Sequence, residues 1–413
     1  MSRTPQDSPG LTVVHDAAEL VVGPDEGTGV VVLEDAAFAA LDGEVVAVGP
    51  TDEVLAEYPV ADADTAIDAT GKTVLPGFVD PHTHALFAGD RSDEFVAKLR
   101  GATYEEILAD GGGILRTVDA VREASDEELA ANLTGHLDAM LAHGTTTVEV
   151  KTGYGLDTET ELRMLSAIDA AGSDHPVDVV PTFMGAHAVP RGMDAEAYTE
   201  SVVSDQLPAV AEQGVAEFCD VFCERGVFTA EQSRRILEAG RDHGLTPKIH
   251  ADEFAAIGGT DVAAAVGAAS ADHLLHTDDE GRDVLVEAGV TPVMLPGTAF
   301  GLGADYADAR AFLDAGHEVA LATDFNPNCF ARSMSFVATL ASVGMRMTPH
   351  EAIRGVTSAA AGALDLDDGT GTLRAGSPAD AVVLDVPTAS HLSYRFDTNP
   401  VSTVLKSGVV ARE

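Results

Sequence analysis

Residues 75–84 read Leu-Pro-Gly-Phe-Val-Asp-Pro-His-Thr-His, a short apolar run that ends in two histidines separated by one residue. Alternate side chains of an extended strand point to the same side, so His82 and His84 can reach one point. A metal ion bound at a strand end is one explanation of this pair. Ordinary surface or core histidines are the other, and the rest of the chain must decide.

Eight short apolar runs, this one included, alternate with helical patterns along the middle of the chain. They are Val74–Val79, Thr145–Val150, Val177–Phe183, Phe218–Phe222, Pro247–Ile249, Ala271–Leu275, Pro292–Leu295 and Glu318–Ala322. Helix-start signals between them are the pairs Ser125 with Glu128, Thr229 with Gln232 and Thr348 with Glu351. Eight alternations predict an α/β fold of the (β/α)8 type, a TIM-type barrel, over residues 76–368. The long interval 85–144 predicts extra structure on the catalytic face.

The two chain ends have a different texture. Residues 11–75 hold short β-branched runs separated by turns, and the tail after Gly369 repeats this pattern. Such runs are typical of strands joined by tight turns. We therefore expect residues 1–75 and 369–413 to form one small composite domain, β-sandwich-like in character, beside the barrel.

The charge and the few cysteines limit the function classes. The 413 residues contain 24 basic and 68 acidic side chains, a net charge of −44. Nucleic acids and anionic membranes need a positive face, so neither is an expected partner. Three cysteines make no disulfide framework, and no run approaches the roughly 18 apolar residues of a membrane span. We expect a cytoplasmic protein, with Cys219 and Cys223 as core thiols.

Other strand ends strengthen the metal hypothesis. His250 ends the fifth run and Asp324 follows the eighth. Active sites of such barrels lie at the C-terminal ends of the strands. His82, His84, His250 and Asp324 are therefore the predicted ligands of one divalent ion per chain, Zn²⁺ or Fe²⁺, which would acidify a bound water.

Two further residues are candidates for catalysis. Glu253 lies three residues after His250 and could pass protons between the water and a substrate nitrogen. An exposed loop acid in an acidic chain is the plainer reading of Glu253. His273, in the sixth run, could orient the water or stabilise a developing oxyanion.

Together these stretches resemble the amidohydrolase superfamily and, within it, the imidazolonepropionase family of histidine degradation. The resemblance rests on LPGFVDPHTH, HTHALFAGDRSDEF, GGGILRTVDAVREAS, VEVKTGYGLD, TFMGAHAVP, DVFCERGVFTAEQSRRIL, KIHADEF, SADHLLHTDDEG, LATDFNPN and GTLRAGSPADAVVLD. These motifs are spread over most of residues 72–390. The separate His-x-His pair is generic, whereas TGYGLD and GAHAVP together are specific.

The resemblance implies an activity and a set of substrate contacts. The family opens the ring of 4-imidazolone-5-propanoate with water and gives N-formimidoyl-L-glutamate. Arg91 would bind the propanoate carboxylate, a task that suits a guanidinium. The other implied contacts come from Tyr104, Tyr154, His187, Glu253, Asn326, Asn328 and Cys329. The expected partner is thus a small-molecule substrate, and we also expect a homodimer.

The chain departs from the family pattern after Asp324. The usual sequence there is Asp-Phe-Asn-Pro-Gly followed by Ser or Thr, and this chain has Asn328 and Cys329 instead. Asn tolerates a left-handed backbone better than most residues, so it could replace Gly. A thiol is a poorer hydrogen-bond donor than a hydroxyl.

Two other functions use the same residues. An aminohydrolase of purines or pyrimidines would share the metal set but would not need Arg91. A non-catalytic metal-binding protein would need neither Glu253 nor His273, and the presence of both argues against it.

Overall fold

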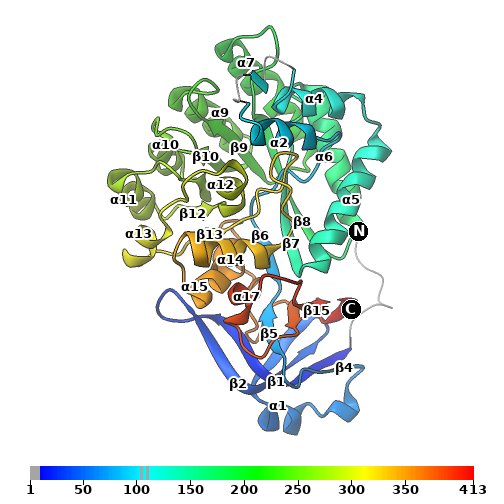
Figure 1. The fold of residues 1–413 in the computed structure, drawn as a ribbon. Coiled ribbons are helices and arrows are strands. Elements are labelled where there is room, and N and C mark those ends of the chain that lie inside the picture. Colours follow the sequence, from blue (N-terminus) through cyan, green and yellow to red (C-terminus); the bar gives the residue numbers. More distant parts are fainter. Residues whose placement is uncertain (1–9, 103–105, 108–110) are drawn as a thin grey trace.

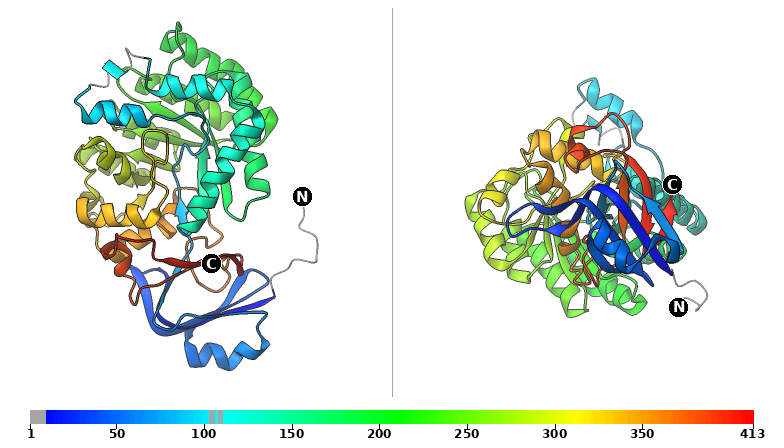
Figure 2. Two further views of the ribbon diagram at one scale, coloured as in Figure 1. Left: turned by 45° about the vertical axis from the view of Figure 1, so that its right-hand side comes forward. Right: turned by 90° about the horizontal axis from the view of Figure 1, so that it is seen from below.

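The computed structural model describes residues 10–102, 106–107 and 111–413. Its strands form two sheets of eight (Figure 1). One sheet is a barrel of parallel strands surrounded by helices, and the other is a mixed sheet built from both chain ends. The mixed sheet lies below the barrel in Figure 1, and the view from below in Figure 2 shows its strands crossing the barrel end.

The barrel strands follow one another in chain order. They are β6 (Phe78–Asp80), β7 (Thr145–Lys151), β8 (Asp178–Ala186), β9 (Phe218–Cys223), β10 (Thr246–Ala251), β11 (Ser270–His273), β12 (Thr291–Met294) and β13 (Ala320–Leu321). All neighbouring pairs are parallel. The first and last strands approach beyond their C-terminal ends, where the amide of Asp324 donates to His82 O and that of His84 to Phe325 O. The barrel therefore closes at the predicted metal ligands.

Helices cover the outside of the barrel. Those between the strands are α5 (Asp126–Ala142), α6 (Thr158–Ser173), α7 (Ala195–Ser201), a π-helical turn (Val202–Gln206), α8 (Leu207–Gln213), α9 (Ala230–Asp242), α10 (Gly259–Val266), α11 (Asp279–Ala288), α12 (Pro296–Leu302) and α13 (Ala309–Asp314). After the last strand come α14 (Met334–Gly344), α15 (Pro349–Gly355), α16 (Ser358–Gly362) and α17 (His391–Tyr394). The interval 85–144 also contains α2 (Ser92–Leu99) and α4 (Ile114–Glu123), as its length suggested.

The predicted helix-start residues form capping interactions in the structure. Both halves of the capping box form at Thr229 and at Thr348. Ser125 caps α5 through its side chain, which accepts from the amide of Glu128. These caps satisfy amides that the first helical turn cannot pair.

The second sheet joins the two chain ends. Its strands are β1 (Leu11–Pro24), β2 (Val30–Leu41), β3 (Glu44–Pro50), β4 (Thr65–Asp68), β5 (Thr73–Pro76), β14 (Ala381–Leu384), β15 (Val401–Lys406) and β16 (Val409–Arg412). They are ordered β16-β15-β14-β5-β1-β2-β3, with β4 also on β1. Helix α1 (Thr51–Glu57) and a 3₁₀ turn (Val60–Asp62) lie against it. The strands of the predicted composite domain are thus hydrogen-bonded into one mixed sheet.

The first apolar run, Val74–Val79, divides between the two sheets. Thr73–Pro76 pairs with β14 in the mixed sheet, whereas Phe78–Asp80 starts the barrel. Gly77 allows the chain to pass between them, because a Cβ there would lie 2.2 Å from the hydroxyl of Thr146. The run predicted as one strand therefore forms two strands, and Gly77 joins them where the backbone packs closely against Thr146.

Buried side chains fill the space between barrel and helices. Cys219 and Cys223 are free and buried there, which confirms their interpretation as core thiols. Among the described residues, no helix is long and apolar enough to cross a membrane.

Candidate metal-dependent active site

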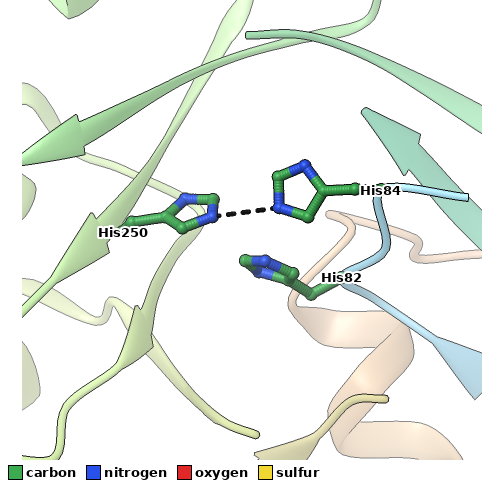
Figure 3. A group of neighbouring side chains, drawn as sticks. All are labelled: His82, His84 and His250. Carbon is green, nitrogen blue, oxygen red and sulfur yellow. Dashed lines mark hydrogen bonds between the residues drawn. The ribbon is translucent and has the colours of Figure 1, made fainter. Parts of the chain in front are cut away.

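Three histidines converge at the C-terminal end of the barrel. His82 and His84 follow β6, and His250 lies on β10 (Figure 3). One ligand atom from each lies within 4.8 Å of the others, and the Nε2 atoms of His84 and His250 are 3.3 Å apart. All three residues are at most 3% exposed. The predicted triad thus forms in the folded chain.

Asp324 lies against the same cluster. Its Oδ1 is 3.6 Å from Nε2 of His82 and 3.8 Å from Nε2 of His84. Its other oxygen accepts from the hydroxyl of Thr298. The backbone of Asp324 has φ 50°, a conformation that costs a non-glycine residue energy and concentrates at functional sites.

These atoms fit a divalent cation. Two ligands each about 2.1 Å from one ion are at most about 4.2 Å apart, and the three separations given above meet that limit. Nε2 of His82 is buried without a hydrogen-bond partner. Burial lowers the pKa values of His82 and His84 well below the usual imidazole value, so both rings are neutral, as ligation requires.

Two carboxylates orient the histidines from behind. Nδ1 of His82 is 2.6 Å from Asp272, and Nδ1 of His250 is 3.1 Å from Asp220. A carboxylate on Nδ1 fixes the tautomer that leaves Nε2 free to bind a metal. The sequence analysis missed both residues. Both are acidic residues inside barrel strands, and that position was the sequence signal that could have revealed them.

Glu253 and His273 lie together beside the cluster. Oε2 of Glu253 is 3.8 Å from Nε2 of His273, and neither ring nitrogen of His273 has a hydrogen-bond partner. Burial, with the charges of Asp324 and Glu224, raises the pKa of Glu253 well above the usual carboxyl value. Glu253 is 9% exposed, so it is not the freely solvated loop acid of the plainer reading.

Tyr154 and His187 form one wall of the site. The His187 ring stacks on His84 with centroids 4.6 Å apart, and the Tyr154 ring is 5.2 Å from that of His187. The buried carboxylate of Glu161 accepts from the amides of Gly153, Gly155 and Leu156, which fixes the loop that carries Tyr154. Gly153 has φ 104°, and a Cβ there would meet His187 at 2.9 Å.

Arg91 begins helix α2 at the mouth. Its guanidinium donates through Nε and Nη2 to Oε2 of Glu94, at 3.0 and 2.8 Å. Burial raises the pKa of Tyr154 above its usual value, and the charge of Arg91 opposes that rise. Tyr104, also predicted to contact substrate, lies outside the described residues.

The loop after Asp324 is held by its own side chains. Oδ1 of Asn326 accepts from the amides of Asn328 and Cys329, and its Nδ2 donates to Asp324 O. Asn328 is not among the residues with positive φ, so its replacement of Gly needs no left-handed backbone. Its Oδ1 instead accepts from Lys98, and Cys329 directs its thiol to Thr323 O at 3.7 Å.

Lys151, at the end of β7, lies inside the barrel. Its amine is 2.7 Å from Glu149 and 2.7 Å from Asp220, and Lys248 is 3.3 Å from Glu149. All four side chains are fully buried. We call these four residues the buried ion network. It supports Asp220, which in turn orients His250.

Comparisons with known proteins agree with this site. The model of the amidohydrolase family matches residues 73–411. The chain is 65% identical over 399 residues to the imidazolonepropionase of Haloarcula marismortui, covering 96% of this chain and 95% of that protein. It is 63% identical over 406 residues to that of Halobacterium salinarum, covering 97% of each.

Solved structures share the fold at low identity. A zinc-bound adenosine deaminase from Xanthomonas campestris superposes with a TM-score of 0.74 at 16% identity, over 98% of this chain and 93% of that one. A triazine hydrolase variant gives 0.76 at 18%, over 98% and 95%. These two likenesses concern the fold alone. With the family model and the near full-length relatives, the chain belongs to the amidohydrolase family and, within it, to the imidazolonepropionases.

Proposed function

We propose that this protein hydrolyses 4-imidazolone-5-propanoate to N-formimidoyl-L-glutamate. The observation that carries the proposal is 63–65% identity over nearly the whole chain to proteins named imidazolonepropionase. The convergent Nε2 atoms of His82, His84 and His250 support a hydrolytic site.

The metal set comprises these three histidines and Asp324, with one Zn²⁺ or Fe²⁺ per chain. Imidazole and carboxylate ligands suit either ion. When bound, the ion supplies Lewis acidity that makes water a nucleophile near neutral pH. Asp272 and Asp220 hold two of the rings in the required tautomer.

The remaining residues bind substrate and move protons. Arg91 holds the propanoate, while Tyr154 and His187 flank the ring. Asn326, Asn328 and Cys329 form the facing loop, and Tyr104 is a further substrate contact that the resemblance implies. Water adds to the ring carbonyl carbon, His273 stabilises the developing oxyanion, and Glu253 carries the proton to the departing ring nitrogen. The carbon–nitrogen bond breaks and the carbonyl becomes a carboxylate.

We further infer a cytoplasmic homodimer. This inference rests on the few cysteines and on the resemblance stated above. Sedimentation of the purified protein tests the dimer.

One assay tests the activity. Freshly generated 4-imidazolone-5-propanoate is mixed with metal-loaded protein, and the loss of its ultraviolet absorbance is followed. A His82→Ala sample gives the background rate. Absorbance loss at the background rate would refute the proposal, and hydrolytic deamination of a purine or pyrimidine instead would favour the aminohydrolase reading.

A further inference from the structure

One cation at the mouth has no role so far. Lys98 lies on α2 at the seventh position after Arg91, with Glu94 between them at the third. Residues spaced by three, four and seven share a helix face, so Arg91, Glu94 and Lys98 project together. Glu94 on this face is buried and Lys98 contacts the loop after Asp324, whereas Phe95, Val96 and Leu99 of the same helix are 50%, 43% and 72% exposed.

The charges on that face do not cancel. Glu94 is occupied by Arg91, by the amide of Gly113 at 3.0 Å and by Arg116 at 3.7 Å. Among the described residues, Lys98 has no carboxylate within 4.0 Å, although the chain carries 68 acidic side chains. Arg116 pairs more closely with Asp93, at 2.8 Å, so Glu94 is the one acid on the face that carries Arg91 and Lys98, in a protein of net charge −44.

The amine of Lys98 is held near the substrate by a neutral partner. It donates to Oδ1 of Asn328 at 2.6 Å and so links α2 to the loop after Asp324. Burial and the neighbouring Arg91 lower the pKa of Lys98. An ammonium has three donors, and an amide oxygen occupies one of them. A carboxylate is a stronger acceptor than that amide because the bond is charge-assisted.

We propose that Lys98 is a second carboxylate-binding residue, which together with Arg91 holds the anionic side chain of the substrate. This proposal takes the identity of that anion from the proposed function, on which it rests. Asn328 keeps the amine in place until substrate arrives. Arg91 supplies the planar donor pair and Lys98 the point charge, both from the same face of α2.

The test replaces Lys98 with Met and with Arg and measures steady-state kinetics on 4-imidazolone-5-propanoate. Lys98→Met should raise KM about 10- to 100-fold, the range expected for a hydrogen bond to a charged group, and change kcat less than about threefold. Lys98→Arg should restore KM to within about threefold. The matched control is Lys72→Met in the mixed sheet, which should leave both constants unchanged.

A second substrate separates binding from a structural role. An imidazolone whose side chain ends in a carboxamide has no anion to bind, so wild type and Lys98→Met should hydrolyse it with equal KM. Wild-type KM for the acid in Lys98→Met would overturn the proposal. Equal losses on acid and amide would also overturn it, because they would show that Lys98 only supports the fold.

Calorimetric binding of imidazole-4-propanoate, a ring with the same side chain, distinguishes this proposal from the proposed activity. Weaker binding to Lys98→Met than to wild type supports the Lys98 site even if the wild type fails to open the imidazolone ring, a failure that would refute the activity alone. Equal binding to both proteins refutes the Lys98 site.

Discussion

Two groups of buried polar side chains occupy the barrel, and they differ in whether opposite charges pair within them. In the buried ion network, Lys151 lies between Glu149 and Asp220, and every charge faces an opposite one. Above it, Nε2 of His82 and both ring nitrogens of His273 have no partner. A buried polar group without a partner is costly, so the fold must keep the upper group for a ligand. The lower group serves as its support.

The largest expected effect removes a ligand from the upper group. Each of His82→Ala, His84→Ala, His250→Ala and Asp324→Ala should lose bound metal and activity together, because the remaining atoms cannot complete the coordination. Elemental analysis and the ultraviolet assay measure the two losses. His243→Ala, exposed at the end of α9, is the control. Undiminished metal content in all four variants would contradict the assignment.

Glu253→Gln tests the upper group without removing a predicted metal ligand. The amide keeps the shape of the side chain but cannot accept a proton, so turnover should fall by about 10²–10⁴ while metal content stays at the wild-type level. A variant that keeps normal turnover, or that loses its metal, would exclude the proton-transfer role.

The pH dependence of the rate tests the role of Glu253 independently. The proposed role needs an ionised Glu253, so the wild-type rate should rise with pH through the pKa of this residue. Because burial raises that pKa, the acidic limb should lie above the ordinary carboxylate range. In Glu253→Gln this limb should disappear.

Lys151→Met disturbs the lower group instead. It leaves Glu149 and Asp220 buried with one cation fewer, and breaking a buried pair costs about 3–5 kcal/mol. The free energy of unfolding in urea should fall by that amount. Lys72→Met, in a less buried setting, should change it by less than about 0.5 kcal/mol. Equal stability of the two variants would show that the network does not support the barrel.

The contrast between the two buried groups also explains which site residues could be predicted from the sequence. His82, His84, His250 and Asp324 could be grouped from the sequence because strand ends of a barrel meet at one face, a rule that needs no tertiary contact. Asp220 and Asp272 were missed because their role lies in which histidine each one touches across the barrel. The ion pairs of Lys151 could not be predicted either, since alternation along β7 does not say how far a long side chain reaches into the interior.

The loop regions were the least predictable from pattern alone. Arg91 came from resemblance, and its spacing of three from Glu94 allowed their ion pair but did not show that the pair would face the site. Asn328 was assigned a backbone role, whereas in the structure its side chain contacts Lys98 on a helix 230 residues away. Such contacts depend on the placement of the 85–144 interval over the mouth, which periodicity does not specify.

The smallest expected effect concerns Arg91, which lies at the rim rather than in either buried group. Lys at this position keeps the charge but loses the planar pair of donors, so it should bind the propanoate through one bond instead of two. It would also hold Glu94 less well, because Nε and Nη2 of Arg91 both donate to that carboxylate. Substrate binding should weaken by about 1–3 kcal/mol, seen as a higher KM with metal content unchanged. The carboxamide substrate separates the two causes: a rise in KM confined to the acid assigns the loss to the carboxylate, whereas a rise on both substrates assigns it to displacement of α2. An unchanged KM would show that the carboxylate is held elsewhere.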